Sequence, residues 1–335
     1  MKMEKFKALS LDELCQSLCE NKKTLIVFHV RSDADAVGSA FALRELLRVM
    51  GIQSYCACSD ELPEKLSFLT DGVQWSVLLE DDMRLDYERI VSVDSASPAQ
   101  LGTLFNRLHK DIDIMVDHHA SGTPYAANYI DSNAAATGEI IYRVAKRLLE
   151  MGEIDEIPPR VINCVYAAIS GDTGCFKFSN ATPDTYRLAA ELIELGAEHV
   201  EINRMLFDCK SMTQIRVEGE AARHIKTCAD GKVAWVSVPY SLREELSARD
   251  EHLETLIDVA RSLEGVEVAL SIRENSDRAT YRVSIRSATD FDVSYVCARF
   301  GGGGHKRAAG CTVSASSITE AEQKVIAEIS RLWDK

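Results

Sequence analysis

Residues 24–51 read TLIVFHVRSDADAVGSAFALRELLRVMG, an apolar run followed by a polar stretch and then by a helical pattern. The run TLIVF has the length and the β-branched content of a buried strand. From about Gly38 onward, apolar side chains recur at helical spacing. His29, Asp33 and Asp35 lie between these two elements. The stretch therefore predicts a strand, a polar turn and a helix, with three potential metal ligands at the end of the strand.

The same alternation of strand and helix patterns continues along the first part of the chain. Strand-like apolar runs lie at 87–95 and 111–119, and helical patterns lie at 137–152 and 160–171. Continuous apolar strands separated by helices are typical of a mostly parallel sheet with helices on both faces. The sequence therefore predicts an α/β fold whose ligands bind beyond the carboxyl ends of the strands.

A second alternation begins at 232–240 and continues through 266–275 and 279–288 to a short helix near 293–300. A chain of this length normally forms more than one domain. We expect an active-site cleft between two α/β domains, the second being the smaller. The expected parts are a catalytic domain over 1–195, a helical connector over 196–230 and a substrate-binding domain over 231–335.

The composition is that of an acidic globular protein, with 335 residues, a net charge of −14 and 46% hydrophobic residues. No apolar stretch approaches the roughly 20 residues that a membrane-spanning helix needs. The first residues resemble an amphipathic helix and lack the apolar core of a signal peptide, so we expect a cytoplasmic protein without membrane contacts. The negative charge disfavours tracking along long nucleic acids, but metal ions in one cleft would permit a small anionic substrate.

Ten cysteines are present, and a disulfide framework is not expected in a long chain without a secretion signal. Cys56 and Cys58 share one face of a strand pattern, and Cys15 and Cys19 are one helical turn apart. Neither pair has the second pair or the nearby histidines of a zinc site. We interpret the cysteines as buried thiols.

Three further segments place aspartate or histidine at the ends of predicted elements. These residues are Asp94, Asp117, His118, His119 and Asp172. Because the carboxyl ends of parallel strands share one edge, we expect these residues to converge with the first group. Several carboxylates at one site cannot all stay ionised unless cations lie among them. Two divalent ions would balance four carboxylates, and a mixed set of aspartates and histidines suits Mn²⁺.

Simpler interpretations exist for most of these residues taken singly. Asp33 and Asp35 could cap the helix that is expected near Gly38. Asp94 could begin a turn. The doublet His118–His119 is harder to explain in this way, because adjacent strand residues point to opposite faces. The combination of segments favours a metal centre more than any single motif does.

Together these motifs resemble the DHH phosphoesterase superfamily. They are H-x-x-x-D-x-D at 29–35, VDS around Asp94, DHH at 117–119 and GDTG at 171–174. The glycine-rich stretch FGGGGHKRAAG at 300–310 is similar to the signature of the DHH-associated domain. The order of the motifs matches the bacterial oligoribonucleases (nanoRNases) and pAp phosphatases of this superfamily. Gln100 stands where many members carry an arginine.

The resemblance implies a role for each residue of the first domain. Two Mn²⁺ ions would be bound, with Mg²⁺ or Co²⁺ as substitutes, and Asp94 would bridge them. The other ligands would be His29 and Asp33 for one ion, and Asp35, His118 and Asp172 for the second. The catalytic residues would be Asp94, Asp117 and His119. Of these, His119 would face the substrate phosphate and Asp117 would orient a histidine ring.

In the second domain, the resemblance implies that substrate is bound by Arg286, Gly303, Gly304 and His305. Alternation along 279–288 puts Arg286 on the same strand face as Arg282 and Ser284. Four consecutive glycines permit a tight backbone whose amides can face an anion.

The implied activity is hydrolysis of short RNA or DNA oligonucleotides, linear pApA or pAp, through attack by a hydroxide that two metal ions activate. Alternatives are a phosphodiesterase for cyclic dinucleotides and a sensor that binds nucleotides without turnover. A RecJ-type exonuclease is disfavoured because no basic stripe is present. A family II inorganic pyrophosphatase would lack the glycine-rich signature. Related enzymes are often dimers, so the resemblance also allows for a homodimer.

Overall fold

The computed structural model describes residues 6–70, 76–77, 86–120 and 122–333. The chain divides into two compact units, Met1–Cys209 and Lys210–Lys335, and each is described here by itself. The segment 196–230, expected as a connector, is divided between the two units. Helix α6 (His199–Asn203) belongs to the first unit, and α7 (Met212–Arg223) belongs to the second.

The first unit is built on a parallel sheet with the strand order β3-β2-β1-β4-β5-β6. All its strand pairs are parallel, which confirms the predicted α/β class. The short strands at the two edges, β3 and β6, were not predicted. The strands are β1 (Thr24–Val27), β2 (Ser54–Cys58), β3 (Ser76–Val77), β4 (Arg89–Val93), β5 (Ile114–Asp117) and β6 (Ala127–Ile130).

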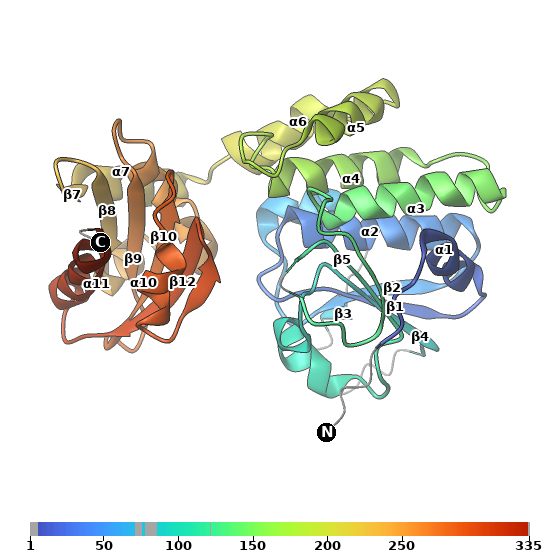
Figure 1. Cartoon of the computed structure of the whole chain (residues 1–335), viewed down its shortest axis with the longest axis horizontal. Helices are drawn as coiled ribbons and strands as arrows, with labels where there is room; N and C mark the ends of the chain where they lie inside the picture. The colour runs from blue at the N-terminus through green and yellow to red at the C-terminus, as the bar shows by residue number, and fades with distance from the viewer. Residues whose placement is uncertain (1–5, 71–75, 78–85, 121, 334–335) are drawn as a thin grey trace. The chain divides into compact units, whose positions relative to one another are not determined.

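Helices cover one face of this sheet in successive layers. Helix α2 lies against the strands, and α3 and α4 pack on α2 (Figure 1). The opposite face is covered by the 3₁₀ helix η2 and by loop residues such as Tyr87, rather than by α-helices. The helices are α1 (Leu11–Cys19), α2 (Ala34–Val49), α3 (Thr137–Met151), α4 (Pro159–Asp172), α5 (Pro183–Glu194), η1 (Glu64–Leu69), η2 (Pro98–Arg107) and η3 (Arg204–Asp208).

Local sequence explains where helix α1 begins. Helix α1 starts after a capping box, in which the Ser10 side chain accepts from the backbone of Glu13 and Glu13 accepts from the backbone of Ser10. The first five residues of the expected N-terminal helix lie outside the described residues. In the described part of the chain, no helix is long and apolar enough to cross a membrane.

All ten cysteines lie within the described residues, and none of them forms a disulfide bond. Cys56 and Cys58 both face the core between the first sheet and its helices, as the alternation along the strand predicted. Burial raises the pKa of both thiols. These two thiols therefore behave as small apolar core groups.

The second unit contains a mixed sheet with the strand order β11-β12-β10-β9-β8-β7. Strands β8 and β9 are parallel, and the other pairs are antiparallel. The strands are β7 (Lys226–Cys228), β8 (Val233–Val238), β9 (Val268–Glu274), β10 (Thr280–Ser287), β11 (Gly303–His305) and β12 (Ala308–Ser314). The further helices are α8 (Tyr240–Glu245), η4 (Asp250–Leu253), α9 (Leu256–Arg261), α10 (Val293–Ala298) and α11 (Ile318–Trp333).

The two faces of the second sheet differ. Helices α10 and α11 pack on one face along β9, β10 and β12. On the other face, α7 and α9 pack on β8 and the start of β9. The residues that β10 and β12 present to this second face are polar or small, and they are half-buried or exposed. This part of the sheet carries the substrate-binding residues that the sequence predicted.

Candidate active site

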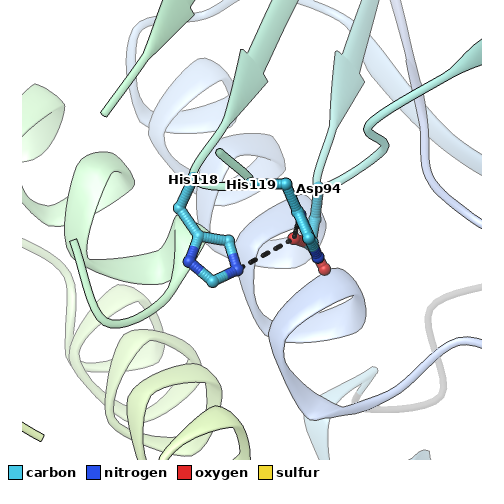
Figure 2. A group of neighbouring side chains, drawn as sticks. All are labelled: Asp94, His118 and His119. Atoms are coloured by element: carbon cyan, nitrogen blue, oxygen red, sulfur yellow. Dashed lines mark ion pairs between the residues drawn. The ribbon is translucent and has the colours of Figure 1, made fainter. Parts of the chain in front are cut away.

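The aspartates and histidines singled out in the first unit converge at the carboxyl edge of its sheet. His29, Asp94 and the pair His118–His119 follow β1, β4 and β5 respectively. Asp33 and Asp35 lie at the start of α2, and Asp172 ends α4. Their ligand atoms form three groups in which every atom lies within 4.8 Å of the others. The groups are His29, Asp33 and Asp94; Asp35, His118 and Asp172; and Asp94, His118 and His119 (Figure 2).

Asp94 lies at the centre of this arrangement and is almost fully buried. Its Oδ2 atom is 3.4 Å from Nε2 of His29, and its Oδ1 atom is 3.8 Å from Nε2 of His118. The two oxygens thus face two different histidines. Its backbone has the left-handed φ of 53°, which an aspartate tolerates better than most residues. This position suits a carboxylate that is shared by two cations.

The two histidines present the same ring nitrogen to the carboxylates. Nδ1 of His29 lies 2.9 Å from the carbonyl oxygen of Val30, and Nδ1 of His118 lies 3.2 Å from that of Ala134. A carbonyl can only accept, so this contact assigns the proton to Nδ1 in the neutral ring. In this neutral form the lone pair of Nε2 faces the aspartates, as in metal-binding histidines whose rings are oriented by a second hydrogen bond. Without a cation, burial opposes the charged ring of His29, but Asp33 and Asp94 outweigh burial and raise the pKa of His29 well above its usual value.

The distances between the donor atoms fit a shared cation. Nε2 of His118 is 3.4 Å from Asp172 and 3.8 Å from Asp35, and Nε2 of His29 is 3.7 Å from Asp33. These separations are too long for good hydrogen bonds. Two atoms that bind one divalent ion at about 2.0–2.2 Å are separated by about 3–4 Å. Imidazole nitrogens and carboxylate oxygens together are a donor set that suits Mn²⁺.

The site carries more negative charge than the protein itself can neutralise. Burial, together with the nearby Asp94, Asp172 and Asp33, raises the pKa of Asp35 well above its usual value. Burial and the neighbouring carboxylates also raise the pKa of Asp172 to about 8. Near neutral pH, Asp172 therefore favours its protonated form in the absence of a cation, and the raised pKa of Asp35 shifts that carboxyl group in the same direction. A divalent ion at the site would displace those protons.

Asp33 caps helix α2 with Oδ1, which accepts from the backbone N–H groups of Asp35 and Ala36 at 3.1 and 3.0 Å. The capping interpretation is therefore correct for Asp33, but the cap sets the start of the helix at Ala34. The expected start near Gly38 is wrong. Loss of solvation raises the pKa of Asp33. The hydrogen bond and the charge of His29 outweigh this effect and lower the pKa of Asp33 to about 2.

Asp35 does not cap its own helix. It accepts hydrogen bonds from the first backbone N–H groups of α3, those of Thr137 at 2.7 Å and Gly138 at 2.9 Å. The residue before α3, Ala136, offers no side-chain cap. The positive end of α3 therefore faces this buried carboxylate, which favours negative charge at this point. Gly138 is required here, because an added Cβ would lie 2.4 Å from that of Ala168 on α4.

Asp117 holds the ring of His119. The fully buried Asp117 accepts with Oδ1 from Nδ1 of His119 at 2.8 Å and from the backbone N–H of His118 at 2.8 Å. Its Oδ2 atom is buried and has no hydrogen-bond partner within the described residues. The hydrogen bond to Asp117 raises the pKa of His119 to about 9, so this ring is an imidazolium at neutral pH. The histidine that Asp117 orients is thus His119, not His118.

The predicted substrate-binding residues of the second unit share one end of its sheet. Gly303, Gly304 and His305 form the edge strand β11. His305 pairs with Ala308, and Ala308 pairs with Arg286 on β10, so the histidine and the arginine lie in one row. Burial lowers the pKa of Arg286, whose Nη1 donates to its neighbour's carbonyl. The glycines therefore form a strand edge instead of a free loop.

Comparison with known families identifies both units. The model of the DHH family, N-terminal domain, matches residues 23–169, and the model of the DHHA1 domain matches residues 230–331. The chain thus contains a DHH-family N-terminal domain followed by a DHHA1 domain. Together with the similar proteins named below, these domains make the chain a hydrolase.

Similar proteins agree with this assignment. The chain is 26% identical over 303 residues to the bifunctional oligoribonuclease and PAP phosphatase NrnA of Thermus thermophilus, covering 90% of this chain and 87% of that protein. It is 25% identical over 322 residues to the Bacillus subtilis protein of the same name, covering 96% and 97%. An exopolyphosphatase-related protein from Bacteroides fragilis has the same fold, with a TM-score of 0.85, 20% identity and coverage of 96% and 97%.

Thr137 is a part of this DHH site that the sequence did not reveal. In the sequence it has the character of an ordinary helix start. In the structure it is fully buried, and its Oγ1 donates to Oδ1 of Asp94 at 2.9 Å while its backbone N–H donates to Asp35. Thr137 thus fixes the orientation of two candidate ligands at once.

Gln100, which stands where many members of the superfamily carry an arginine, has an exposed side chain. Its backbone carbonyl accepts a hydrogen bond from the backbone N–H of Val30.

We predict that Thr137→Val weakens the binding of Mn²⁺ and lowers hydrolytic activity by about tenfold, because groups that orient ligands usually contribute 10–100-fold. Valine keeps the shape but removes the donor to Asp94. The measurement is a calorimetric Mn²⁺ titration alongside a rate assay. Thr70→Val is the matched control, since Thr70 is also buried and, within the described residues, its hydroxyl donates only to Ser67. Equal behaviour of the two variants would contradict the role of Thr137.

Proposed function

We propose that this DHH protein hydrolyses the phosphoester bonds of short linear nucleotides, with two Mn²⁺ ions as cofactors and Mg²⁺ or Co²⁺ as substitutes. The substrates are di- to pentanucleotides of RNA or DNA, pApA and pAp. The observation that carries this proposal is that two ligand groups, one with Asp94 and one with His118, lie side by side, with Oδ1 of Asp94 3.8 Å from Nε2 of His118. The names of the similar Thermus and Bacillus proteins support the choice of substrates.

Six residues would hold the two ions. The first set is His29, Asp33 and Asp94, and the second is Asp35, His118 and Asp172, with Asp94 shared. When bound, such ions neutralise the charge of a phosphoryl group and lower the pKa of nearby water. The hydrogen bonds from the histidine rings to the carbonyl oxygens of Val30 and Ala134, and from Thr137 to Asp94, keep these metal-binding atoms aimed at the same space.

His119 supplies a positive charge and a proton next to this space. Its Nδ1 is held by Asp117 at 2.8 Å and lies 3.6 Å from Asp94, and its side chain is 30% exposed. An imidazolium that is partly open to solvent can stabilise charge on a phosphoryl oxygen or give its proton to the leaving oxygen. Asp117 keeps the ring charged and fixed, so both residues belong to the proposed catalytic set.

The DHHA1 domain would bind a substrate phosphate through Arg286, His305 and the edge strand with Gly303 and Gly304. A guanidinium group can bind a phosphate in a bidentate manner. An added Cβ at Gly304 would lie 2.5 Å from the carbonyl oxygen of Ala308, so this position has to be glycine. The net charge of −14 opposes the binding of long polyanions and favours short substrates.

A hydrolysis panel with and without Mn²⁺ tests this proposal. The compounds are pAp, pApA, a labelled pentanucleotide, a long single strand, cyclic di-adenosine monophosphate and pyrophosphate. We expect Mn²⁺-dependent cleavage of the short linear nucleotides at higher kcat/KM than the long strand. Preferred cleavage of the cyclic compound would replace the proposed substrate class. Binding of Mn²⁺ and nucleotide without any turnover would overturn the proposal in favour of a sensor.

A further inference from the structure

The open face of the second sheet carries more cationic and hydroxyl groups than the proposed function uses. On β10, Arg282, Ser284 and Arg286 point to this face, and the residues between them are buried in the core on the other side. The predicted alternation of these three side chains is thus confirmed. Arg286 belongs to the proposed phosphate site, and Arg282 lies four residues away on the same face.

Arg282 does not lie alone on this face. In the sheet register it stands between Arg273 on β9 and Thr312 on β12. Directly opposed like charges on neighbouring strands destabilise a sheet. Arg273 is only 7% exposed, and no hydrogen bond or ion pair of its side chain is found in the described part of the chain. Burial and the charge of Arg282 lower the pKa of Arg273 to about 10, so it remains protonated at neutral pH.

A third guanidinium group lies in the same neighbourhood. Arg243 donates to Asp250 at 2.5 Å, and its Nε–H is buried without a partner within the described residues. Asp250 and Glu254 are the acidic groups that act on Arg273, whereas Arg243 and Arg282 are the basic ones. Arg243, Arg273 and Arg282 thus bring three guanidinium groups to this end of the strands. An anion bound here would reduce the repulsion between them.

We propose that Arg282 and Thr312, supported by Arg273, form a second phosphate site on the open face of the DHHA1 sheet. The proposal rests on the proposed function and narrows its substrate class to oligonucleotides with at least three phosphates. The guanidinium group of Arg282 and the exposed hydroxyl of Thr312 supply donors to the phosphate oxygens. The buried Arg273, which pairs with Arg282 on the neighbouring strand, adds a positive charge to the site.

The spacing along β10 sets the length of ligand that reaches both sites. Arg282 and Arg286 are four residues apart, which corresponds to about 13–14 Å along an antiparallel strand. The two phosphorus atoms on either side of one ribose are joined by six covalent bonds of about 1.5 Å, which limits their separation to less than about 9 Å. Strand side chains stand roughly perpendicular to the sheet, so side chains in this orientation keep the two guanidinium groups at about the backbone spacing. Neighbouring phosphates, as in pAp or pApA, then do not span both positions. The first and third phosphates of a trinucleotide can do so.

The test compares Arg282→Gln with the wild-type protein on pAp, pApA, pApApA and a labelled pentanucleotide. We expect kcat/KM to fall about tenfold for the two longer substrates, because one charge-assisted contact is lost. For pAp and pApA, kcat/KM should change less than twofold. The control is Arg331→Gln, which removes an equal charge from a surface ion pair on α11, the helix that packs on the opposite face. Thr312→Val, at an exposed position, is a milder second variant.

Binding without turnover separates this proposal from the proposed function. In the presence of a chelator, fluorescence anisotropy of a labelled trinucleotide is expected to give a Kd about tenfold higher for Arg282→Gln. The slope of log K against log salt should fall by about 0.7 with the loss of one phosphate contact. A wild-type protein that cleaves no nucleotide would overturn the proposed function, and the anisotropy would still decide on the second site. Equal losses for pAp and the trinucleotide, or no loss for either, would refute the second site.

Discussion

Asp94→Asn is expected to lower kcat by roughly a thousandfold on every phosphoester that the protein cleaves. This loss is comparable to the largest decreases in kcat that follow the removal of one group that stabilises charge in a transition state. The two oxygens of Asp94 face His29 and His118, at 3.4 and 3.8 Å. An asparagine replaces one of these oxygens with an NH₂ group, which cannot bind a cation. The remaining oxygen can serve only one ligand group, so the shared position is lost. The measurement is the rate of phosphate or nucleotide release at saturating Mn²⁺.

The fold should survive this substitution. Asparagine tolerates the left-handed backbone of residue 94, and its carbonyl can still accept from Thr137. Removing a buried charge should also leave the metal-free protein at least as stable. Asp111→Asn, at an exposed position, is the control with the same change in charge. If Asp94→Asn kept a tenth of the activity, or lost activity only because it unfolded, the central role of Asp94 would be wrong.

Mn²⁺ is expected to stabilise the metal-free protein strongly, with a pH dependence set by the raised pKa values. At about 100 times the Kd, a ligand that binds only the native state adds about 2.7 kcal/mol per site to the free energy of unfolding. The pKa of Asp172 is about 8 when folded and near 3.8 when unfolded, so the native state holds the extra proton between these values. The stability of the metal-free protein should therefore fall as the pH rises through this range.

Bound Mn²⁺ should reverse this trend, because it replaces the proton and binds more tightly as the pH rises towards 8. Melting curves at pH 6 and pH 8, with and without Mn²⁺, measure both effects. Asp172→Asn should reduce the pH dependence but not abolish it, because the pKa values of His119 and Asp35 are also raised. It should remove roughly half of the gain from Mn²⁺, because Asp172 belongs to one ligand group only. A gain that is equal at both pH values, or unchanged in the variant, would contradict the site.

The sequence predicted the parts of the site that depend on strand ends. His29, Asp94 and the histidine doublet were placed correctly, because the carboxyl ends of parallel strands must share one edge. The start of α2 was misplaced because the apolar pattern becomes clear only after Gly38, whereas the cap at Asp33 decides where the helix begins. Thr137 was missed because a helix start explains a threonine completely, and only tertiary structure brings it to Asp94.

The second unit shows a different limit of sequence reasoning. Alternation along a single strand gave the shared face of Arg282 and Arg286. The pairing of Arg282 with Arg273 depends on the register between two strands, and no residue pattern within either strand fixes that register. Strand β12 went unpredicted because its small residues, AAGCTVS, have only a weak apolar alternation.

The position of bound manganese tests the central claim most directly. Crystals grown with Mn²⁺ and measured at the manganese absorption edge give an anomalous signal from each ion. The expected result is two peaks per chain, one among His29, Asp33 and Asp94 and the other among Asp35, His118 and Asp172. Peaks elsewhere, or no peak beside Asp94, would contradict the assignment of these residues to a metal centre.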